Sequence, residues 1–131
     1  MENTEKILRQ YHTIAVVGAS PDPTRASHRV FEYLAGHGYE AFPVNPTVRD
    51  VGGKVSYRSL SAIPEKVEVV DIFRKSEEVP AIVDEAIKVG AKAIWMQEGV
   101  INKAAAAKAE AAGLLVVMDK CMMKEHHRLT D

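Results

Sequence analysis

The sequence lacks the features that mark disulfide-rich, nucleic-acid-binding and membrane proteins. One cysteine among 131 residues excludes an internal disulfide framework and fits a reducing compartment. The formal net charge is −1, so general attraction to nucleic acid or to an anionic membrane is not expected. No apolar run approaches the length of a membrane span, and the acidic start lacks the order of a signal peptide. We therefore expect a cytoplasmic protein with neither nucleic acid nor a membrane as partner.

Aromatic residues are also scarce, at 6% of the chain, although 47% of the residues are hydrophobic. The core must then consist mainly of Val, Ile, Leu and Ala, which suits parallel strands covered by helices on both faces. A chain of 131 residues is long enough for one domain, and no segment resembles a linker. We expect residues 1–131 to form a single domain.

Apolar runs alternate with helical patterns along the chain. Strands are predicted at 13–17, 40–44, 67–73, 93–96 and 114–118. Helices are predicted at 4–11, around Val30 with Gly38 as the stop, from the N-cap Ser76 to Gly90, and from the N-cap Asn102 to Gly113. Residues 47–66 are predicted to be irregular, with a stub of strand or turn at 55–57. This alternation predicts an α/β fold: a Rossmann-like domain with a doubly wound, parallel, five-stranded sheet and helices on both faces.

Ligands of such sheets collect at the carboxyl ends of the strands, near the point where the strand order reverses. Five predicted loops follow strands directly, at 18–27, 45–46, 74–76, 97–100 and 119–121. The first begins with Gly18, which allows a close backbone approach to an anion, and it carries Arg25, a permanent phosphate donor. Hydroxyl donors follow in the same loop: Ser20, Thr24 and Ser27. The plainer alternative is that Gly18 serves only the turn and Arg25 is solvated.

The pattern departs from the common nucleotide-binding fingerprints. The second and third glycine positions of G-x-G-x-x-G hold Ser20 and Pro23. The second strand ends at Asn45 and Pro46, without the acid that would hold the ribose hydroxyls of NAD. A Walker motif is absent as well. The interpretation as an NAD(P) site is therefore weakened, and a related fold with a different ligand is favoured.

Four short motifs, each at the end of a predicted strand, resemble those of the stand-alone CoA-binding proteins. That family is similar to the N-terminal CoA-binding domain of the succinyl-CoA synthetase α subunit. The resemblance runs from about Tyr11 to Leu129. The motifs are Gly18-Ala19-Ser20-Pro21, Pro43-Val44-Asn45-Pro46, Asp71-Ile72-Phe73-Arg74 and Trp95-Met96-Gln97-Glu98-Gly99-Val100.

The resemblance implies that the chain binds coenzyme A or an acyl-CoA. It places the phosphates at Gly18, Ala19, Ser20 and Arg25, with Ser27 as a further hydroxyl donor. It places the nucleotide beside Asn45 and Pro46, and the adenine or pantetheine between Phe73, Arg74 and Ser76. It lines the pantetheine path with Gln97, Glu98 and Gly99. Two arginines at strand ends suit the charges of CoA, which carries a diphosphate and usually a ribose 3′-phosphate.

The resemblance does not extend to catalysis. No residue of this chain matches the phosphorylated histidine of the synthetase, so we expect CoA binding without a catalytic residue. The alternative is an enzyme that uses NAD(P) or CoA thioesters, with Glu98 as a general base. Cys121 is interpreted as a small buried residue, with a mixed disulfide to CoA as the alternative. His126 and His127 do not complete a familiar metal site, and a homo-oligomer or a protein partner stays open.

Overall fold

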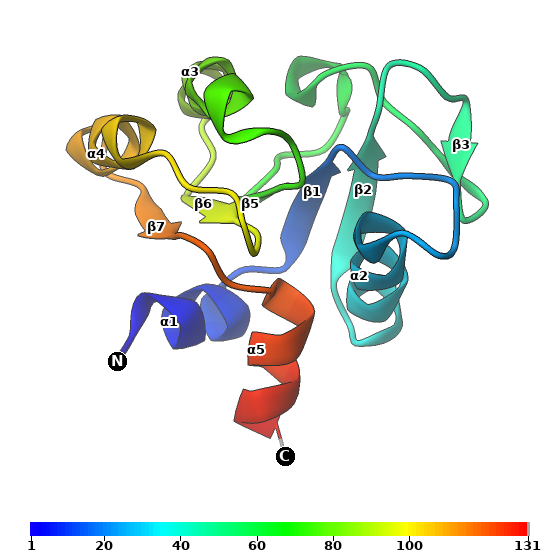
Figure 1. The fold of residues 1–131 in the computed structure, drawn as a ribbon, viewed down its shortest axis with the longest axis horizontal. Coiled ribbons are helices and arrows are strands. Elements are labelled where there is room, and N and C mark those ends of the chain that lie inside the picture. Colours follow the sequence, from blue (N-terminus) through cyan, green and yellow to red (C-terminus); the bar gives the residue numbers. More distant parts are fainter. Residues whose placement is uncertain (131) are drawn as a thin grey trace.

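The computed structural model describes residues 1–130, which form a five-stranded sheet with five α-helices around it. Figure 1 shows this arrangement. The strands of the sheet are β1 Thr13–Val17, β2 Glu40–Val44, β5 Val69–Ile72, β6 Ala93–Met96 and β7 Leu115–Val117. The helices are α1 Asn3–Gln10, α2 Ala26–Gly36, α3 Val79–Val89, α4 Lys103–Ala111 and α5 Met122–Thr130, with short 3-10 turns η1 Leu60–Ala62 and η2 Ser76–Glu78.

The sheet has the strand order β2-β1-β5-β6-β7, and every neighbouring pair is parallel. The chain moves from β1 outward to β2 and then returns to the other side of β1 as β5. The strand order therefore reverses between β1 and β5, which is where open α/β sheets bind ligands. The predicted fold class, a doubly wound parallel sheet with a Rossmann-like topology, is confirmed.

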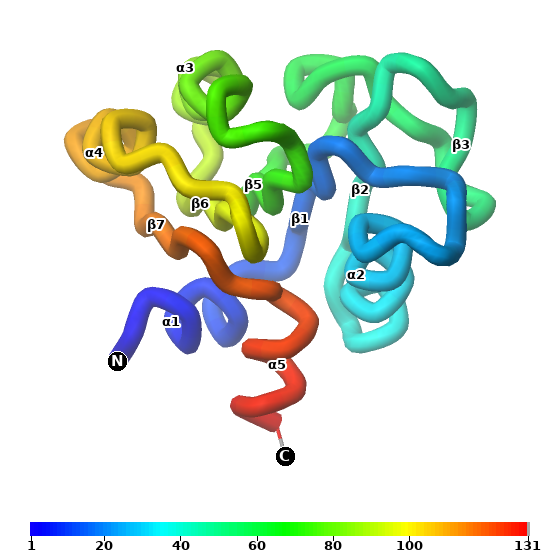
Figure 2. The backbone as a smooth tube through the Cα atoms, viewed as in Figure 1, coloured from blue at the N-terminus to red at the C-terminus, as the bar shows by residue number. Residues whose placement is uncertain are grey.

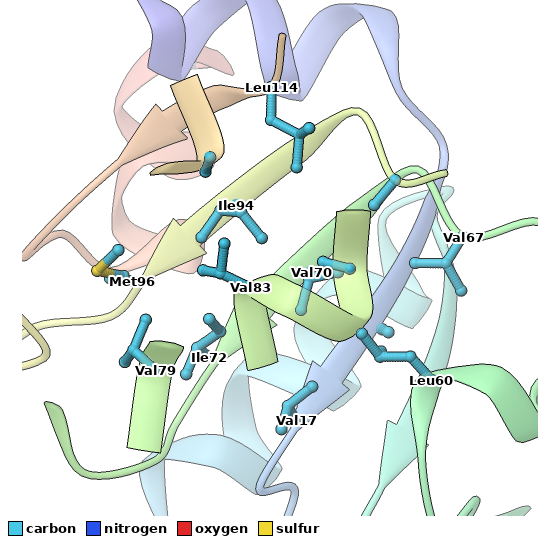
Figure 3. Close-up of a cluster of buried hydrophobic side chains, with 14 of the residues drawn as sticks. Val17, Leu60, Val67, Val70, Ile72, Val79, Val83, Ile94, Met96 and Leu114 are labelled. Atoms are coloured by element: carbon cyan, nitrogen blue, oxygen red, sulfur yellow. The ribbon is translucent and has the colours of Figure 1, made fainter. Parts of the chain in front are cut away.

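Helices cover both faces of the sheet. Figure 1 shows α3 and α4 on one side and α1, α2 and α5 on the other. Strand residues alternate between the faces. Val70, Ile72 and Ile94 meet α3 in one buried cluster, part of which is drawn in Figure 3. Val69 and Trp95 belong to the second cluster, beneath α1, α2 and α5. Two apolar layers thus hold the sheet in place.

The start of α3 differs from the sequence-based prediction. Ser76 does not cap that helix, because its Oγ accepts a hydrogen bond from the Ile101 amide at 2.9 Å. The segment Ser76–Glu78 is a 3-10 turn, and α3 begins after it. Asn102 does cap α4 as predicted, since its Oδ1 accepts from the Ala105 amide at 2.9 Å. The hydroxyl of Ser76 is used to join two loops rather than to start a helix.

Residues 47–66 are more ordered than an irregular loop. They contain a small antiparallel pair, β3 Asp50–Val51 and β4 Lys54–Val55. Tyr57 then forms a parallel bridge with Val44, through the Asn45 amide to the Tyr57 carbonyl at 2.9 Å and the Tyr57 amide to the Pro43 carbonyl at 3.0 Å. The predicted stub of strand is thus present, and it forms a single parallel β-bridge on the outer side of β2.

The chain ends lie away from the carboxyl edge of β1 and β2. Figure 2 shows α1 and α5 below the sheet, with the chain leaving β1 and β2 at the upper edge. Within residues 1–130, no helix is long and apolar enough to cross a membrane. The upper edge, where the loops after β1 and β2 begin, is therefore the part of the molecule to search for a ligand site.

Candidate functional site

Two adjoining clefts lie at the carboxyl edge of the sheet. The larger, of about 460 Å³, is bordered by Gly18, Asn45, Arg74 and the first turns of α3. The smaller, of about 360 Å³, lies over the start of α2 and is bordered by Gly18, Arg25 and Arg74. Gly18 and Arg74 belong to both clefts, so the two hollows meet at these residues. This meeting point lies beside the reversal of strand order between β1 and β5.

Gly18 is required where the two clefts meet. Its φ of +89° lies in the left-handed region that glycine adopts without strain. A Cβ at this position would lie 2.6 Å from the Phe73 carbonyl oxygen and 3.0 Å from Cδ of Arg74. The Gly18 amide also donates to the Val44 carbonyl at 2.9 Å. Glycine therefore allows the loop after β1 to lie directly against the segment that carries Arg74.

The loop between β1 and α2 is held by its own short polar residues. The Ser20 amide donates to Ser27 Oγ at 3.1 Å, which leaves the Ser27 hydroxyl hydrogen free to donate elsewhere. Asp22 accepts from the amide and the hydroxyl of Thr24 at 2.9 and 2.8 Å, and these bonds lower the pKa of Asp22. Arg25 precedes α2 in an extended conformation, exposed beside the smaller cleft. Gly18, Ser20, Arg25 and Ser27 thus all border the smaller cleft.

Asn45 joins the loops that follow β1 and β2. Its Nδ2 donates to the Ala19 carbonyl at 2.8 Å, while its Oδ1 accepts from the amide and hydroxyl of Thr47 at 3.0 and 2.7 Å. Pro46 lies beside it at the border of the larger cleft. Ala19 is fully buried, so it presents no side chain to a ligand. The side chain of Asn45 therefore bonds to the protein on both sides, and these bonds hold this corner of the cleft in place.

Arg74 forms an ion pair with Glu78 across the end of the larger cleft. Arg74 Nη2 lies 2.7 Å from Oε1 of Glu78, and both side chains are partly exposed. The Lys75 amide donates to Oε2 of the same carboxylate at 3.3 Å. The bond from Arg74 is the main cause that lowers the pKa of Glu78. The guanidinium is thus held at the point that both clefts share, with an acid already beside it.

Gln97 lies beneath the site rather than in it. Its side chain is buried, and its Nε2 donates to Oδ1 of Asp71 at 2.7 Å. Asp71 is fully buried, and its Oδ2 has no hydrogen-bond partner among the described residues. Burial raises the pKa of Asp71 to about 7, although the bond from Gln97 acts in the opposite direction. The side chain of Gln97 borders neither cleft.

The other predicted residues spread along the same edge. Phe73 borders the smaller cleft, whereas Ser76 is bonded to the loop before α4. Glu98 is exposed and pairs with Lys124 at 3.0 Å. The Gly99 amide donates to Asp119 Oδ1 at 2.7 Å. Ser76, Glu98 and Gly99 therefore lie outside both clefts, in the loops beyond β5 and β6.

Several residues that border the larger cleft were not among the predicted site residues. They come from three separate segments: Thr47, Arg58, Ser59, Glu78, Ala81, Ile82 and Glu85. Arg58 directly follows the residue that bridges to β2, so the predicted strand stub at 55–57 was the available signal. The sequence of α3 did not indicate that its residues border a cleft, because the polar and apolar pattern of their exposed face is that of an ordinary solvent-facing helix.

Two other reactive side chains are packed into the fold. The His28 ring contacts the Ser20 carbonyl at 2.8 Å and Glu32 Oε1 at 2.9 Å, and is only 6% exposed. Cys121 is buried within the second cluster. Within the described residues, no group of three or more His, Cys, Asp or Glu is placed to hold a metal ion.

Comparison with known proteins gives this edge a context. The chain is 36% identical over 122 residues to the uncharacterized protein YneT of Bacillus subtilis, covering 93% of this chain and 90% of that one. A hypothetical protein from Pyrococcus horikoshii has the same fold with a TM-score of 0.95 at 46% identity, covering 98% of this chain and 91% of that one. The chain is 26% identical to an ADP-forming acetate–CoA ligase of Archaeoglobus fulgidus, over 83% of this chain but only 17% of the ligase. The family model for a CoA binding domain matches residues 12–127, and the chain belongs to this CoA-binding domain family.

Proposed function

We propose that the chain binds coenzyme A or an acyl-CoA across the two clefts and catalyses no reaction by itself. The observation that carries the proposal is the position of Arg74, which borders both clefts and rests against Gly18. A ligand with a diphosphate at its centre and an arm on each side suits two hollows that meet at an arginine. Coenzyme A has that form.

The phosphates take the place where the clefts meet. Arg74 and Arg25 supply permanent positive charge, and arginine binds phosphate oxygens with paired N–H groups. The Ser27 hydroxyl adds a donor, because its oxygen is already fixed by the Ser20 amide. The start of α2 lies in the same cleft, and a helix N-terminus favours an anion. Four independent donors thus favour phosphate at one point.

The two arms of the ligand leave in opposite directions. The nucleotide takes the larger cleft, where Asn45 and Pro46 border one side and Ala81 and Ile82 form an apolar wall. The pantetheine extends past Phe73 toward the loop 97–99 beyond β6. Because Gln97 is buried, we expect Glu98 and Gly99 to contact the pantetheine there, and Gln97 to support the loop from below.

Glu98 carries the enzymatic alternative and Cys121 carries the alternative of a mixed disulfide with CoA, and neither side chain is free and exposed. Glu98, the candidate general base, is exposed, and its carboxylate forms an ion pair with Lys124 at 3.0 Å. Cys121 is buried. The similarity to the acetate–CoA ligase covers under a fifth of that enzyme, so it supports a shared CoA site rather than ligase activity here.

Calorimetric titration with CoA and with acetyl-CoA tests the proposal. We expect both ligands to bind the wild type, with about tenfold weaker binding in Arg74→Gln and in Arg25→Ala, the size of one lost charge-assisted contact. Arg9→Gln is the matched control, because Arg9 is an exposed arginine of α1, outside both clefts. The absence of binding at millimolar CoA would contradict the proposal.

A thiol-release assay separates binding from catalysis. Acetyl-CoA incubated with the wild type should hydrolyse at the rate seen in buffer. Faster release of free thiol, abolished by Glu98→Gln in a variant that still binds acetyl-CoA, would support the enzymatic alternative instead.

A further inference from the structure

Arg58 is fixed beside the end of β2 by the backbone of its neighbour. Tyr57 bridges to Val44, the last residue of β2, through two hydrogen bonds of 2.9 and 3.0 Å. Arg58 is the next residue, so it lies at the carboxyl edge of the sheet, one strand beyond the turn at Asn45. It borders the larger cleft and also an adjoining hollow of about 370 Å³. The position is set by the sheet, although the segment carrying it is mostly loop.

The charge of Arg58 is not neutralised by the acids around it. The larger cleft is bordered by Glu78 and Glu85. Glu78 pairs with Arg74, and Glu85 accepts bonds from the Leu60 amide at 3.2 Å and from the Ser61 hydroxyl at 2.9 Å. Within residues 1–130, Arg58 has no ion pair and no side-chain hydrogen bond. Of the two arginines that border this cleft, Arg58 is therefore the one without an acidic partner among the described residues.

Hydroxyl groups accompany that arginine. Ser59 borders the same cleft, and its hydroxyl has no partner within the described part of the chain. Thr47 lies on the facing turn, with its Oγ1 bonded to Asn45 at 2.7 Å. An arginine flanked by a free hydroxyl is a usual arrangement for binding a phosphate group. No acid occurs between Asn45 and Val48 to oppose a negative charge.

We infer that Arg58 and Ser59 form a second anion subsite, which binds the phosphomonoester on the ribose of an adenine nucleotide. In sheets of this class the ribose lies past the end of the second strand, where an acid selects free hydroxyls and an arginine accommodates a ribose phosphate. Arg74 takes the diphosphate at one end of the cleft, and Arg58 takes the ribose phosphate at the other. The protein therefore discriminates between CoA and 3′-dephospho-CoA.

This inference rests on the proposed function, because it assigns one part of the CoA molecule to one part of the same cleft. A ribose phosphate is also present in NADPH, at the 2′ position. The shared chemistry is an adenosine phosphomonoester, and the ligand panel below separates the two sources. We assign the 3′-phosphate of CoA, since the fingerprint glycines of a dinucleotide site are replaced by Ser20 and Pro23.

The test is a calorimetric comparison of CoA, 3′-dephospho-CoA, NADPH and NADH on the wild type, Arg58→Gln and Arg9→Gln. We expect the wild type to bind CoA about tenfold more tightly than dephospho-CoA, because the 3′-phosphate adds one charge-assisted contact of about that size. Arg58→Gln should bind the two equally, at the affinity of the wild type for dephospho-CoA. The control Arg9→Gln, which removes the same charge from α1, should keep the tenfold preference.

Each outcome bears on one claim. Equal binding of CoA and dephospho-CoA by the wild type overturns the subsite and leaves the proposed function standing. A preference that survives in Arg58→Gln overturns the assignment to Arg58. Binding of neither CoA form overturns the proposed function itself. Binding of NADPH in preference to NADH, with no binding of CoA, would assign the subsite to the 2′-phosphate and contradict the inference.

Discussion

Arg74 and Glu78 are joined across the end of the larger cleft, with 2.7 Å between Nη2 and Oε1. The two residues are four positions apart, Arg74 in the loop after β5 and Glu78 in the 3-10 turn η2. The arginine proposed to bind the diphosphate therefore already has an anionic partner. A phosphate must share this guanidinium with the carboxylate or displace it.

Replacing Glu78 by Gln should strengthen CoA binding. The variant removes a negative charge beside the diphosphate and frees the guanidinium, so we expect affinity to rise about fivefold at low ionic strength, a modest surface-charge effect. Glu77→Gln is the matched control, because Glu77 is exposed on the same turn and forms no ion pair with any residue of 1–130. Calorimetry with CoA measures both. Weaker binding in Glu78→Gln would show that the ion pair positions Arg74 for the ligand, contrary to this prediction.

Gly18→Ala should destabilise the fold and abolish CoA binding. The added Cβ would approach the Phe73 carbonyl oxygen to 2.6 Å, a distance that forces the backbone to move. Gly38→Ala is a close control, since Gly38 has a similar φ of +91° but nothing within 4 Å of the built Cβ. Both variants lose about 1–2 kcal/mol from the left-handed conformation, and Gly18→Ala loses about 2 kcal/mol more from the clash. Urea unfolding measures the difference, and equal losses would contradict the steric account.

The buried carboxyl of Asp71 should make stability depend on pH. Its pKa is raised by burial from 3.8 to about 7, so the folded state holds a proton that the unfolded chain has released between these values. The free energy of unfolding therefore falls as pH rises from about 4 to 7, and this contribution levels off above 7. The full shift corresponds to a loss on the order of 4 kcal/mol.

Asp71→Asn should remove that dependence. An amide keeps an acceptor for Gln97 Nε2 and carries no charge, so the variant should be more stable than the wild type at pH 8 and similar to it at pH 4. Asp50→Asn applies the same change to an exposed acid and should leave the pH profile unchanged. Urea midpoints at several pH values decide the matter. If the stability of the wild type and that of Asp71→Asn change with pH in the same way, the buried carboxyl is not the cause of the pH dependence.

Asn45→Ala should loosen the corner between the loops after β1 and β2. The variant loses the 2.8 Å bond to the Ala19 carbonyl and both bonds from Thr47, at a cost of about 2 kcal/mol in unfolding free energy. Asn45→Asp keeps the acceptor for Thr47, loses the donor to Ala19 and adds a negative charge at the border of the larger cleft. If the link to the Gly18 loop matters for the ligand, both variants should bind CoA more weakly. Normal CoA affinity in Asn45→Asp would show that this link serves stability alone.

The strands were the most predictable part of the fold, because each is a short apolar run that ends in a glycine or a polar turn. Residues 14–17 form such a run and lie in β1, and Gly18, which follows it, borders both clefts. The N-cap at Ser76 was predicted wrongly, since its hydroxyl bonds to Ile101, a residue 25 positions away. Local pattern cannot reveal a partner at that separation.

The candidate site was predictable only in part, for the same reason. The loop residues Gly18, Arg25 and Arg74 follow strands directly, and a parallel sheet must bring them to one edge. Arg58 reaches that edge through the bridge between Tyr57 and Val44, which is a tertiary contact. The burial of Gln97 beside Asp71 likewise depends on the pairing of β5 with β6, which the sequence does not specify.

The central claim is that coenzyme A binds where Gly18 and Arg74 join the two clefts. A crystal structure of the protein with CoA tests it most directly. The account predicts diphosphate oxygens within hydrogen-bonding distance of the Arg74 guanidinium and the nucleotide between Asn45 and Ile82. CoA bound at another surface, or with its diphosphate away from Arg74, would contradict it.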